Sequence, residues 1–337
     1  MPAVSAFVSN VTDTRLIPKL VDNVYSGNVL TMRLMRNPRT WRGGNQISFP
    51  VYLSPVTTVG SYSGFDSFST TQETKTVKAA FDPSQVYGSA SVSGIQVAIN
   101  RSGDAGVIDL IASELDIVSE ALKQEIGTQV YGDGTGNNSK DILGLQAAVD
   151  DSTSVSTYGG ISRSTYTNWR ATRTAQSGSL SLANIASDFD AAQVGNDTPT
   201  IIVTTPPVFT IYEALLTPTV SHQFSMNDFR MTSDGIARVG GTIAANQGFR
   251  ALTFRGVPVV ADEKCTSGNI YTLNENHLTY WTIPQAAEFK RTENRGFGWT
   301  GWKEPVNQDA ITGQLLHYGQ LTSDSPRTHA RRTGVTS

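Results

Sequence analysis

The sequence predicts a mixed α+β protein, and three observations support this fold class. Apolar residues recur at steps of three or four through Asp104–Tyr131, which predicts one long helix. Gly, Ser and Thr are abundant and only 16% of residues are charged, a composition that favours strands and turns over a helix bundle. A β-branched run at 200–204 leads to Pro206 and Pro207 at a helix start, which is typical of α/β structure.

The predicted long helix is the element around which the other elements are expected to pack. Asp104 is a suitable N-cap, and Lys123 near the other end matches the helix dipole. About 27 residues at 1.5 Å each give a rod of roughly 40 Å. Gly132, Gly134 and Gly136 then end the helical pattern. The apolar stripe consists of Val107, Ile111, Leu115, Val118, Leu122, Ile126 and Val130.

The chain before this helix predicts an arm followed by strands. Residues 1–12 look extended, and 18–36 have only a fair helical stripe that Gly27 interrupts, so we interpret this part as an arm rather than core. Ile47–Leu53 alternates apolar and polar residues and predicts a strand with one apolar face. A return strand is predicted near 74–81, and a further strand at 86–97 leads into the long helix.

The segment between the first two strands, 59–72, has aromatic residues without any apolar periodicity. Tyr62, Phe65 and Phe68 lie among Gly and Ser. One interpretation is a loop that folds back on its own domain. The other is a long projecting hairpin whose aromatic tip another subunit buries, because free hairpins with apolar tips are marginal in water.

The second half of the chain predicts short strands mixed with helices. Residues 145–180 are rich in Ser, Thr and Tyr, with Trp169 as an isolated anchor. Helices are predicted at 182–194 and 206–218, two strands about a turn at 255–258, a third strand at 269–276, and strand-like aromatic sequence at 289–319. From Pro326 onward the chain is basic, with Arg327, His329, Arg331 and Arg332 and no acidic residue. Such a segment can contact nucleic acid, but a short basic tail is more often solvated, and a solvated tail is expected.

Composition and motifs argue against several classes of function. A net charge of −3 does not suit a protein that tracks nucleic-acid phosphates over its whole surface. The single cysteine, Cys265, cannot form an internal disulfide, which fits a reducing compartment, and we expect it to be structural. The N-terminus does not resemble a standard export signal, and no run of 18 apolar residues predicts a membrane span.

No motif predicts a catalytic, cofactor or metal site. The GDGTG sequence at 132–136 resembles a phosphate-binding loop, but it follows a helix and no Gly-Lys-Ser/Thr ends it, so we interpret it as a helix terminator. Asp262 and Glu263 would point to opposite faces of a strand and do not form an acid/base pair. We therefore expect no enzyme activity and no cofactor. The histidines, His222, His277, His317 and His329, lack any paired-ligand spacing.

Several stretches, in this order, resemble the major capsid proteins of tailed bacteriophages, which have the Hong Kong 97-like fold. The strongest is FRGVPVVADE followed by IYTLN in 254–274. The others are DNVYSGNVLTMRL with GGNQISFPVYL, VYGSASVSGIQVAI before the long helix, YGDGTGN and LGL after it, IIVTTPPVFTIYEALL, and GQLLHYGQLTSDSPRTHARRTGV. Together they cover nearly the whole chain.

The resemblance implies a domain organisation and an assembly role. It implies an N-terminal arm at 1–36, an extended loop with flanking strands at 37–97, a peripheral domain with the spine helix at 98–144, an axial domain at 145–285, and a return to the peripheral domain with a C-terminal tail at 286–337. Subunits would form pentamers and hexamers, and these an icosahedral shell around phage double-stranded DNA. The residues expected in intersubunit contacts are Leu20, Val24, Tyr62, Phe65, Phe68, Lys75 and Lys78.

The resemblance also implies partners and a location. The chain's main partner would be itself, with packaged DNA contacted non-specifically, no membrane, and portal, decoration and scaffold proteins as further classes of partner. The location would be the virion, after synthesis in the host bacterial cytoplasm. Many relatives begin with a cleaved scaffolding segment, whereas this sequence begins close to the arm. We therefore expect the scaffold to be a separate protein or to be absent. Lys75 and Lys78 are in the region that crosslinks in certain relatives, but we predict no crosslink.

Two other functions remain open from the sequence. An encapsulin-like compartment would share the fold and hold an enzyme cargo in place of a genome. A monomeric β-rich binding or enzyme domain is the third, and the lack of a site argues against it.

Overall fold

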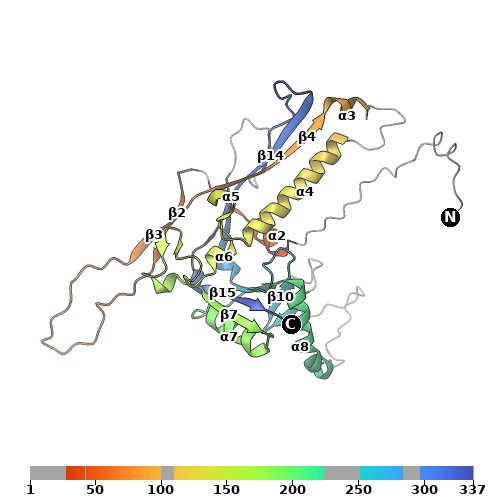
Figure 1. The fold of residues 1–337 in the computed structure, drawn as a ribbon. Helices are drawn as coiled ribbons and strands as arrows, with labels where there is room; N and C mark the ends of the chain where they lie inside the picture. The colour runs from red at the N-terminus through yellow and green to blue at the C-terminus, as the bar shows by residue number, and fades with distance from the viewer. Residues whose placement is uncertain (1–27, 42, 100–109, 224–250, 284–296, 337) are drawn as a thin grey trace, which may run out of the picture.

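The computed structural model describes residues 28–41, 43–99, 110–223, 251–283 and 297–336. Two sheets lie one above the other in Figure 1, and a long hairpin projects from the junction between them. The upper sheet has five strands and the lower sheet has six. The upper sheet consists of β1 (Arg39–Thr40), β12 (Leu278–Thr282), β14 (Ala310–Ser323), β13 (Phe297–Trp299) and β4 (Ser84–Ser93).

The five-stranded sheet carries the predicted long helix on one face. β4 and β14 pair antiparallel over ten residues, and α4 (Leu110–Val130) lies along them. A Cβ atom on Gly88 would come within 2.8 Å of the Val118 side chain, so the glycine lets helix and strand approach closely. The predicted helix is confirmed over Leu110–Val130, and its predicted start at Asp104 lies outside the described residues. The predicted strand at 86–97 is too long, because α3 (Gly94–Ile99) follows β4.

The six-stranded sheet is buried on both faces. Alternate residues along its strands belong to two different hydrophobic clusters. One cluster includes residues of α7 (Leu182–Ala192) and α8 (Pro206–Gln223), and the other includes residues of the upper part of the molecule. This explains why all four residues of β8 (Ile201–Thr204) are buried. The α8 helix runs beyond the predicted 206–218. The sheet order is β7 (Thr172–Gly178), β15 (Ala330–Val335), β11 (Ile270–Leu273), β8, β10 (Val257–Ala261) and β9 (Ala251–Phe254).

Short elements connect the sheets and complete the core. The predicted turn between β9 and β10 is confirmed, with φ of +49° at Arg255 and +83° at Gly256. Trp169 is buried as predicted, and its indole Nε1 donates to the Tyr158 carbonyl at 2.9 Å. The short elements are α5 (Gly136–Ser139), α6 (Leu145–Ala148), β5 (Thr157–Tyr158), β6 (Ile161–Ser162), η1 (Thr167–Trp169), η4 (Glu275–His277) and η5 (Pro326–Thr328).

The helix α2 (Val29–Arg36) corrects the interpretation of 18–36 as an arm outside the core. Val29, Leu30 and Leu34 are buried in the main hydrophobic cluster. No side chain caps the helix locally, and the Leu30 N–H donates to the Asp262 carboxylate at 3.2 Å. The helix is therefore fixed by a residue 232 positions away, which local periodicity cannot show. The rest of the predicted arm, 1–27, lies outside the described residues.

The basic segment from Pro326 onward is also corrected, because it is not a solvated tail. β15 lies between β7 and β11, inside the six-stranded sheet. Arg331 and Arg332 are buried and pair with Asp150 and Asp188. The chain thus returns to both sheets after residue 297, through β13 and β14 above and β15 below.

Candidate functional site: the intersubunit surfaces

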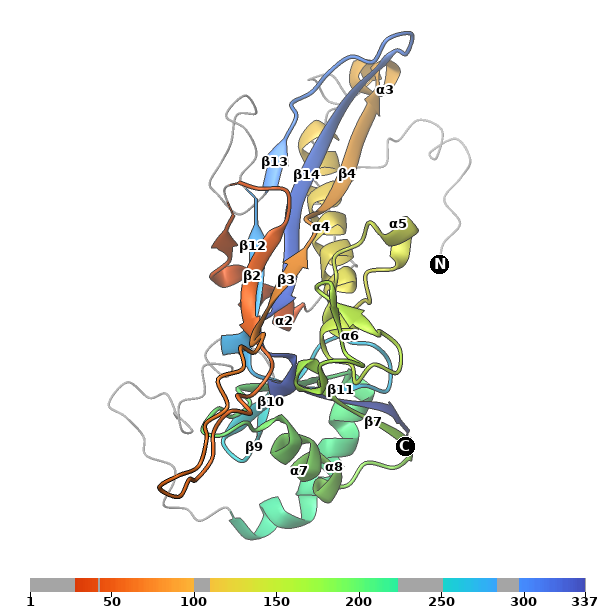
Figure 2. The same cartoon turned by 90° about the vertical axis from the view of Figure 1, so that its left-hand side faces the viewer.

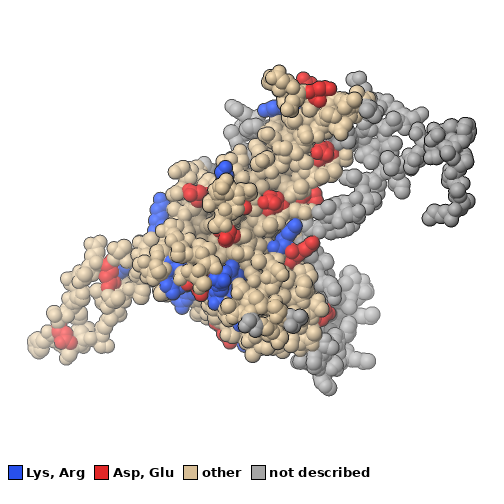
Figure 3. Space-filling view, in the orientation of Figure 1, with Lys and Arg blue, Asp and Glu red and all other residues tan. Residues whose placement is uncertain are grey.

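The long projecting hairpin consists of β2 (Ile47–Tyr52), β3 (Thr76–Phe81) and the loop that joins them. Residues 53–75, which form this loop, contain three charged residues, Asp66, Glu73 and Lys75, so most of its surface is uncharged (Figure 3). Figures 1 and 2 show the loop extending away from both sheets. A segment of this length without secondary structure is uncommon in a compact domain and usually has a function of its own.

The tip of the loop exposes a small aromatic cluster. Tyr62 and Phe68 pack edge to face with their ring centroids 4.9 Å apart, and both are about two-thirds exposed. Phe65 is fully exposed beside a turn in which Ser63 N donates to the Asp66 carboxylate at 2.7 Å. Burying a phenylalanine side chain stabilises by about 1.5–3 kcal/mol relative to leaving it in water. In the described part of the chain, the three rings are therefore largely exposed apart from the contact between Tyr62 and Phe68.

The base of the hairpin, in contrast, is firmly packed. Phe49 stacks on Phe81 at 5.8 Å between ring centroids, and Phe81 packs edge to face on Tyr158 at 5.0 Å. The Ala80 N–H donates to the Gly159 carbonyl at 2.9 Å. The hairpin is therefore anchored to the body at one end and presents apolar side chains at the other.

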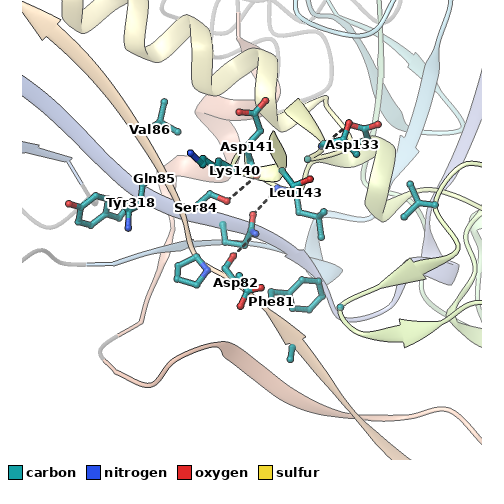
Figure 4. Close-up of a pocket in the computed structure, with 18 of the residues that line it drawn as sticks. Phe81, Asp82, Ser84, Gln85, Val86, Asp133, Lys140, Asp141, Leu143 and Tyr318 are labelled. Carbon is teal, nitrogen blue, oxygen red and sulfur yellow. Dashed lines mark hydrogen bonds between the residues drawn. The ribbon is translucent and has the colours of Figure 1, made fainter. Parts of the chain in front are cut away.

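A broad groove of about 1310 Å³ lies beside this base (Figure 4). Its walls come from the end of β3, the start of β4, the loops around Asp133 and Asp141, and the outer face of β14. The Ser84 hydroxyl donates to the Asp141 carbonyl at 3.0 Å. Gln320 connects two of these walls. Its side chain donates to the Asp82 carbonyl at 2.7 Å, between β3 and β4, and accepts from the Leu143 N–H at 2.9 Å, in the loop after Asp141. These hydrogen bonds connect the segments that form the walls of the groove.

One face of the β4–β14 pair continues the groove, and within the described ranges it is the face opposite to the one that α4 covers. Since α4 packs on the other face, against Gly88 and its neighbours, the alternate residues point away from it. Tyr87 is 71% exposed and lies opposite Leu316 in the ladder, and Tyr318 lies opposite Gln85. Tyr87, Leu316 and Tyr318 all line the groove, and they give its floor apolar surface beside the polar Gln85 and Gln314.

The structure brings together some of the sequence-predicted contact residues. Tyr62, Phe65 and Phe68 share the loop tip, while Lys75 and Lys78 are exposed at its base, on or beside β3. Leu20 and Val24 lie outside the described residues. The sequence did not lead us to predict Tyr87 as a contact residue. Its position could have been noticed, because it is the one large aromatic residue among Gln85, Ser89 and Ser91 on the polar face of an alternating strand. Further exposed apolar residues are Ile95, Ile117 and Val306.

The buried Arg163 and Cys265 side chains lie inside the core and not at the surface. Arg163 is fully buried and donates to the carbonyls of Ala147, Ala148, Val155 and Trp169 at 2.7–3.2 Å, which fixes the loops around α6. Burial raises the pKa of the Cys265 thiol well above its usual value, so the cysteine stays protonated. Nowhere in the described ranges do three or more His, Cys, Asp or Glu side chains gather in a way that could hold a metal ion.

His329 is buried and stays neutral. Its Nδ1 accepts from the Asn274 N–H at 3.2 Å, so Nε2 carries the hydrogen that faces the Ser323 hydroxyl at 3.0 Å. Burial, with a smaller contribution from His277, lowers the pKa of His329 to about 3. The neutral ring therefore contributes stability above its unfolded pKa of about 6.5, and this stability is lost as the pH falls toward the folded pKa.

We expect His329→Asn, whose amide oxygen can replace Nδ1 as acceptor, to flatten the acid side of the stability profile. Wild-type protein should lose about 1.4 kcal/mol per pH unit more than the variant below about pH 6, because its ring must protonate on unfolding. Urea unfolding at a series of pH values between 7 and 4.5 measures this difference. Parallel profiles for the two proteins would show that the buried ring does not govern the acid response.

None of the helices in the described ranges combines the length and the apolar character that a bilayer crossing requires.

Comparison with known proteins gives a consistent result at the level of structure. No protein-family model matches the chain, and a search of curated proteins finds no match. The capsid of cyanophage A-1(L) is similar at a TM-score of 0.74 and 16% identity, over 99% of this chain and all of that chain. The capsid of Myoviridae phage XM1 is similar at 0.58 and 12% identity, over 99% of each chain.

An encapsulin has a related structure. The holo-SrpI encapsulin complex from Synechococcus elongatus PCC 7942 matches at a TM-score of 0.56 and 12% identity, over 99% of this chain and 96% of that chain.

The similarity to the two capsid structures confirms the expected mixed α+β, Hong Kong 97-like fold, and the chain has the fold of tailed-phage capsid proteins.

Proposed function

We propose that this chain is a major capsid protein that assembles through pentamers and hexamers into an icosahedral shell around phage double-stranded DNA. The observation that carries the proposal is the projecting loop, which leaves Tyr62, Phe65 and Phe68 exposed to water. Burial of these three side chains against another copy of the chain would be favourable. Capsid structures are prominent among the structural neighbours, which supports a structural rather than an enzymatic role. The shell would be a component of the virion, made in the host cytoplasm.

The proposed contact places the loop tip of one subunit on the groove and outer β4–β14 face of its neighbour. Tyr87, Leu316 and Tyr318 supply apolar surface on that face, which suits the aromatic cluster. The loop carries little charge, so its burial needs few compensating ion pairs. A contact between two different surfaces of the same chain is heterologous, and such contacts close into rings.

We expect the double substitution Phe65→Asp and Phe68→Asp to abolish shells while leaving the subunit folded. Two carboxylates at the tip cannot be buried against an apolar surface without a large desolvation cost, whereas in the free subunit both positions are exposed. Circular dichroism tests the fold, and negative-stain electron microscopy with light-scattering mass tests assembly. Tyr87→Asp, on the receiving face, should reproduce the defect.

The matched control places the same two charges elsewhere in the loop, at Ser61 and Thr71, which are also exposed. Shells from this control, with none from the aromatic double variant, would assign the effect to the tip cluster. Normal shells from Phe65→Asp with Phe68→Asp would refute the role of the loop in assembly.

An encapsulin-like compartment is the second candidate, because an encapsulin shares the fold. The ratio of absorbance at 260 and 280 nm of particles purified from their natural source separates the two. A ratio typical of nucleic acid supports a genome, and a ratio typical of protein alone supports an enzyme cargo.

A further inference from the structure

Two connections join the upper and lower sheets side by side. Residues 274–277 lead from β11 of the six-stranded sheet to β12 of the five-stranded sheet, and residues 324–329 lead from β14 back to β15. The two connections touch, because the Asp324 N–H donates to the His277 carbonyl at 3.3 Å. Any change in the angle between the sheets must bend these connections.

His277 lies in the first connection and faces two carboxylates. Its Nδ1 is 2.7 Å from an oxygen of Asp324, in the second connection. Its Nε2 is 3.3 Å from an oxygen of Asp197, in the turn between α7 and β8 of the lower sheet. That turn is itself closed by reciprocal backbone bonds of 3.0 and 3.1 Å between Val194 and Asp197. One imidazole thus joins three segments.

The number of protons on the ring decides how many of these contacts can exist. A neutral imidazole has one N–H and one lone pair, so it can donate to only one carboxylate, while the lone pair repels the other. The backbone contact keeps Asp324 beside the ring, which favours Nδ1–H as the donor in the neutral form. The Nε2 contact with Asp197 is favourable only when the ring carries both protons.

We infer that His277 is a pH-dependent clamp that fixes the α7–β8 turn to the connections between the sheets when the ring is protonated. In acid the ring donates to both carboxylates. At higher pH the Asp197 contact is released and the turn can move relative to the connections. The inference does not depend on assembly, since all three segments belong to one subunit.

The other charged and titratable groups around the clamp are already paired or remain neutral. Glu275, from the same connection, is held by Arg33 of α2 through two hydrogen bonds of 2.7 Å and accepts from the Thr200 hydroxyl at 3.1 Å. His329, from the second connection, stays neutral because burial lowers its pKa. Both groups therefore have partners other than the His277 ring.

The test is amide hydrogen exchange of Val194 and Asp197, measured by NMR on unassembled full-length subunits at pH 8 and pH 5.5. We expect protection, corrected for the intrinsic exchange rate, to rise about two- to fivefold on acidification, as suits a partly exposed ion pair. This local measurement separates the clamp from the global loss of stability that protonation of His329 causes in acid.

Asp197→Asn should remove the pH dependence, because an amide can donate to the neutral Nε2 or accept from the protonated one. His277→Gln should remove it too. The matched control is Asp116→Asn, an exposed carboxylate on α4. An equal rise in protection in wild type and Asp197→Asn would overturn the inference, as would no rise in wild type.

Discussion

Replacing Arg332 by Leu is expected to lower the free energy of unfolding by about 3–5 kcal/mol, as for other buried ion pairs that lose one partner. Arg332 binds Asp188 with both ends of its guanidinium, at 2.6 and 2.8 Å, and donates to the Asn184 carbonyl at 2.9 Å. Both side chains are almost fully buried. Leucine would leave the Asp188 carboxylate without its counter-ion in a site where burial already raises the pKa of that carboxyl.

The control for this prediction is Arg327→Leu, only five residues earlier but exposed in η5. Urea unfolding of both variants, followed by circular dichroism, gives the two free energies. We expect Arg327→Leu to change stability by no more than about 0.5 kcal/mol. Equal losses in the two variants would contradict the assignment of Arg332 to the core.

Asp262→Ala should have the second large effect, a loss of about 3 kcal/mol or more. The buried carboxylate accepts from Leu30 N at 3.2 Å, from the Tyr131 hydroxyl at 2.9 Å and from Lys264 N at 3.0 Å. Alanine would leave two buried donors, Leu30 N and the Tyr131 hydroxyl, without an acceptor, at about 1–3 kcal/mol each, and would also remove the partly buried Lys264 bond. Because Asp262 joins α2, the end of α4 and the end of β10, the loss should be cooperative over the whole subunit.

The pH dependence of this difference has a defined sign. Burial raises the pKa of Asp262, so its contribution is greatest in acid and declines as the pH rises through the folded pKa. The gap between wild type and Asp262→Ala should therefore be wider at pH 4 than at pH 7. Glu263→Ala, at the adjacent exposed position, is the control and should leave stability nearly unchanged at both pH values.

The sequence predicts those elements whose pattern is local. The stripe of α4, the alternation of β2 and the positive-φ turn at Arg255 and Gly256 are each encoded within a few neighbouring residues, and the structure confirms them. The burial of α2 and β15 could not be predicted in this way. Each depends on an acidic partner more than a hundred residues away, Asp262 for α2 and Asp188 for β15.

The candidate site likewise has one part that the local sequence predicts and one part that it does not. The aromatic tip could be identified because Tyr62, Phe65 and Phe68 have no periodicity that would bury them locally. The face around Tyr87 could not, because whether a strand face is open depends on which side α4 covers. Surfaces of this kind depend on tertiary packing, which a pattern of residue types in one strand does not specify.

The position of β15 has a consequence for how the protein is made. Among the described strands of the lower sheet it comes last in the chain, yet it pairs with both β7 and β11. While the ribosome is still synthesising the preceding residues, β7 and β11 lack their common neighbour, and Asp188 lacks Arg332, its partner in the buried ion pair. A nascent chain therefore cannot complete this sheet before residue 335 has emerged from the ribosome.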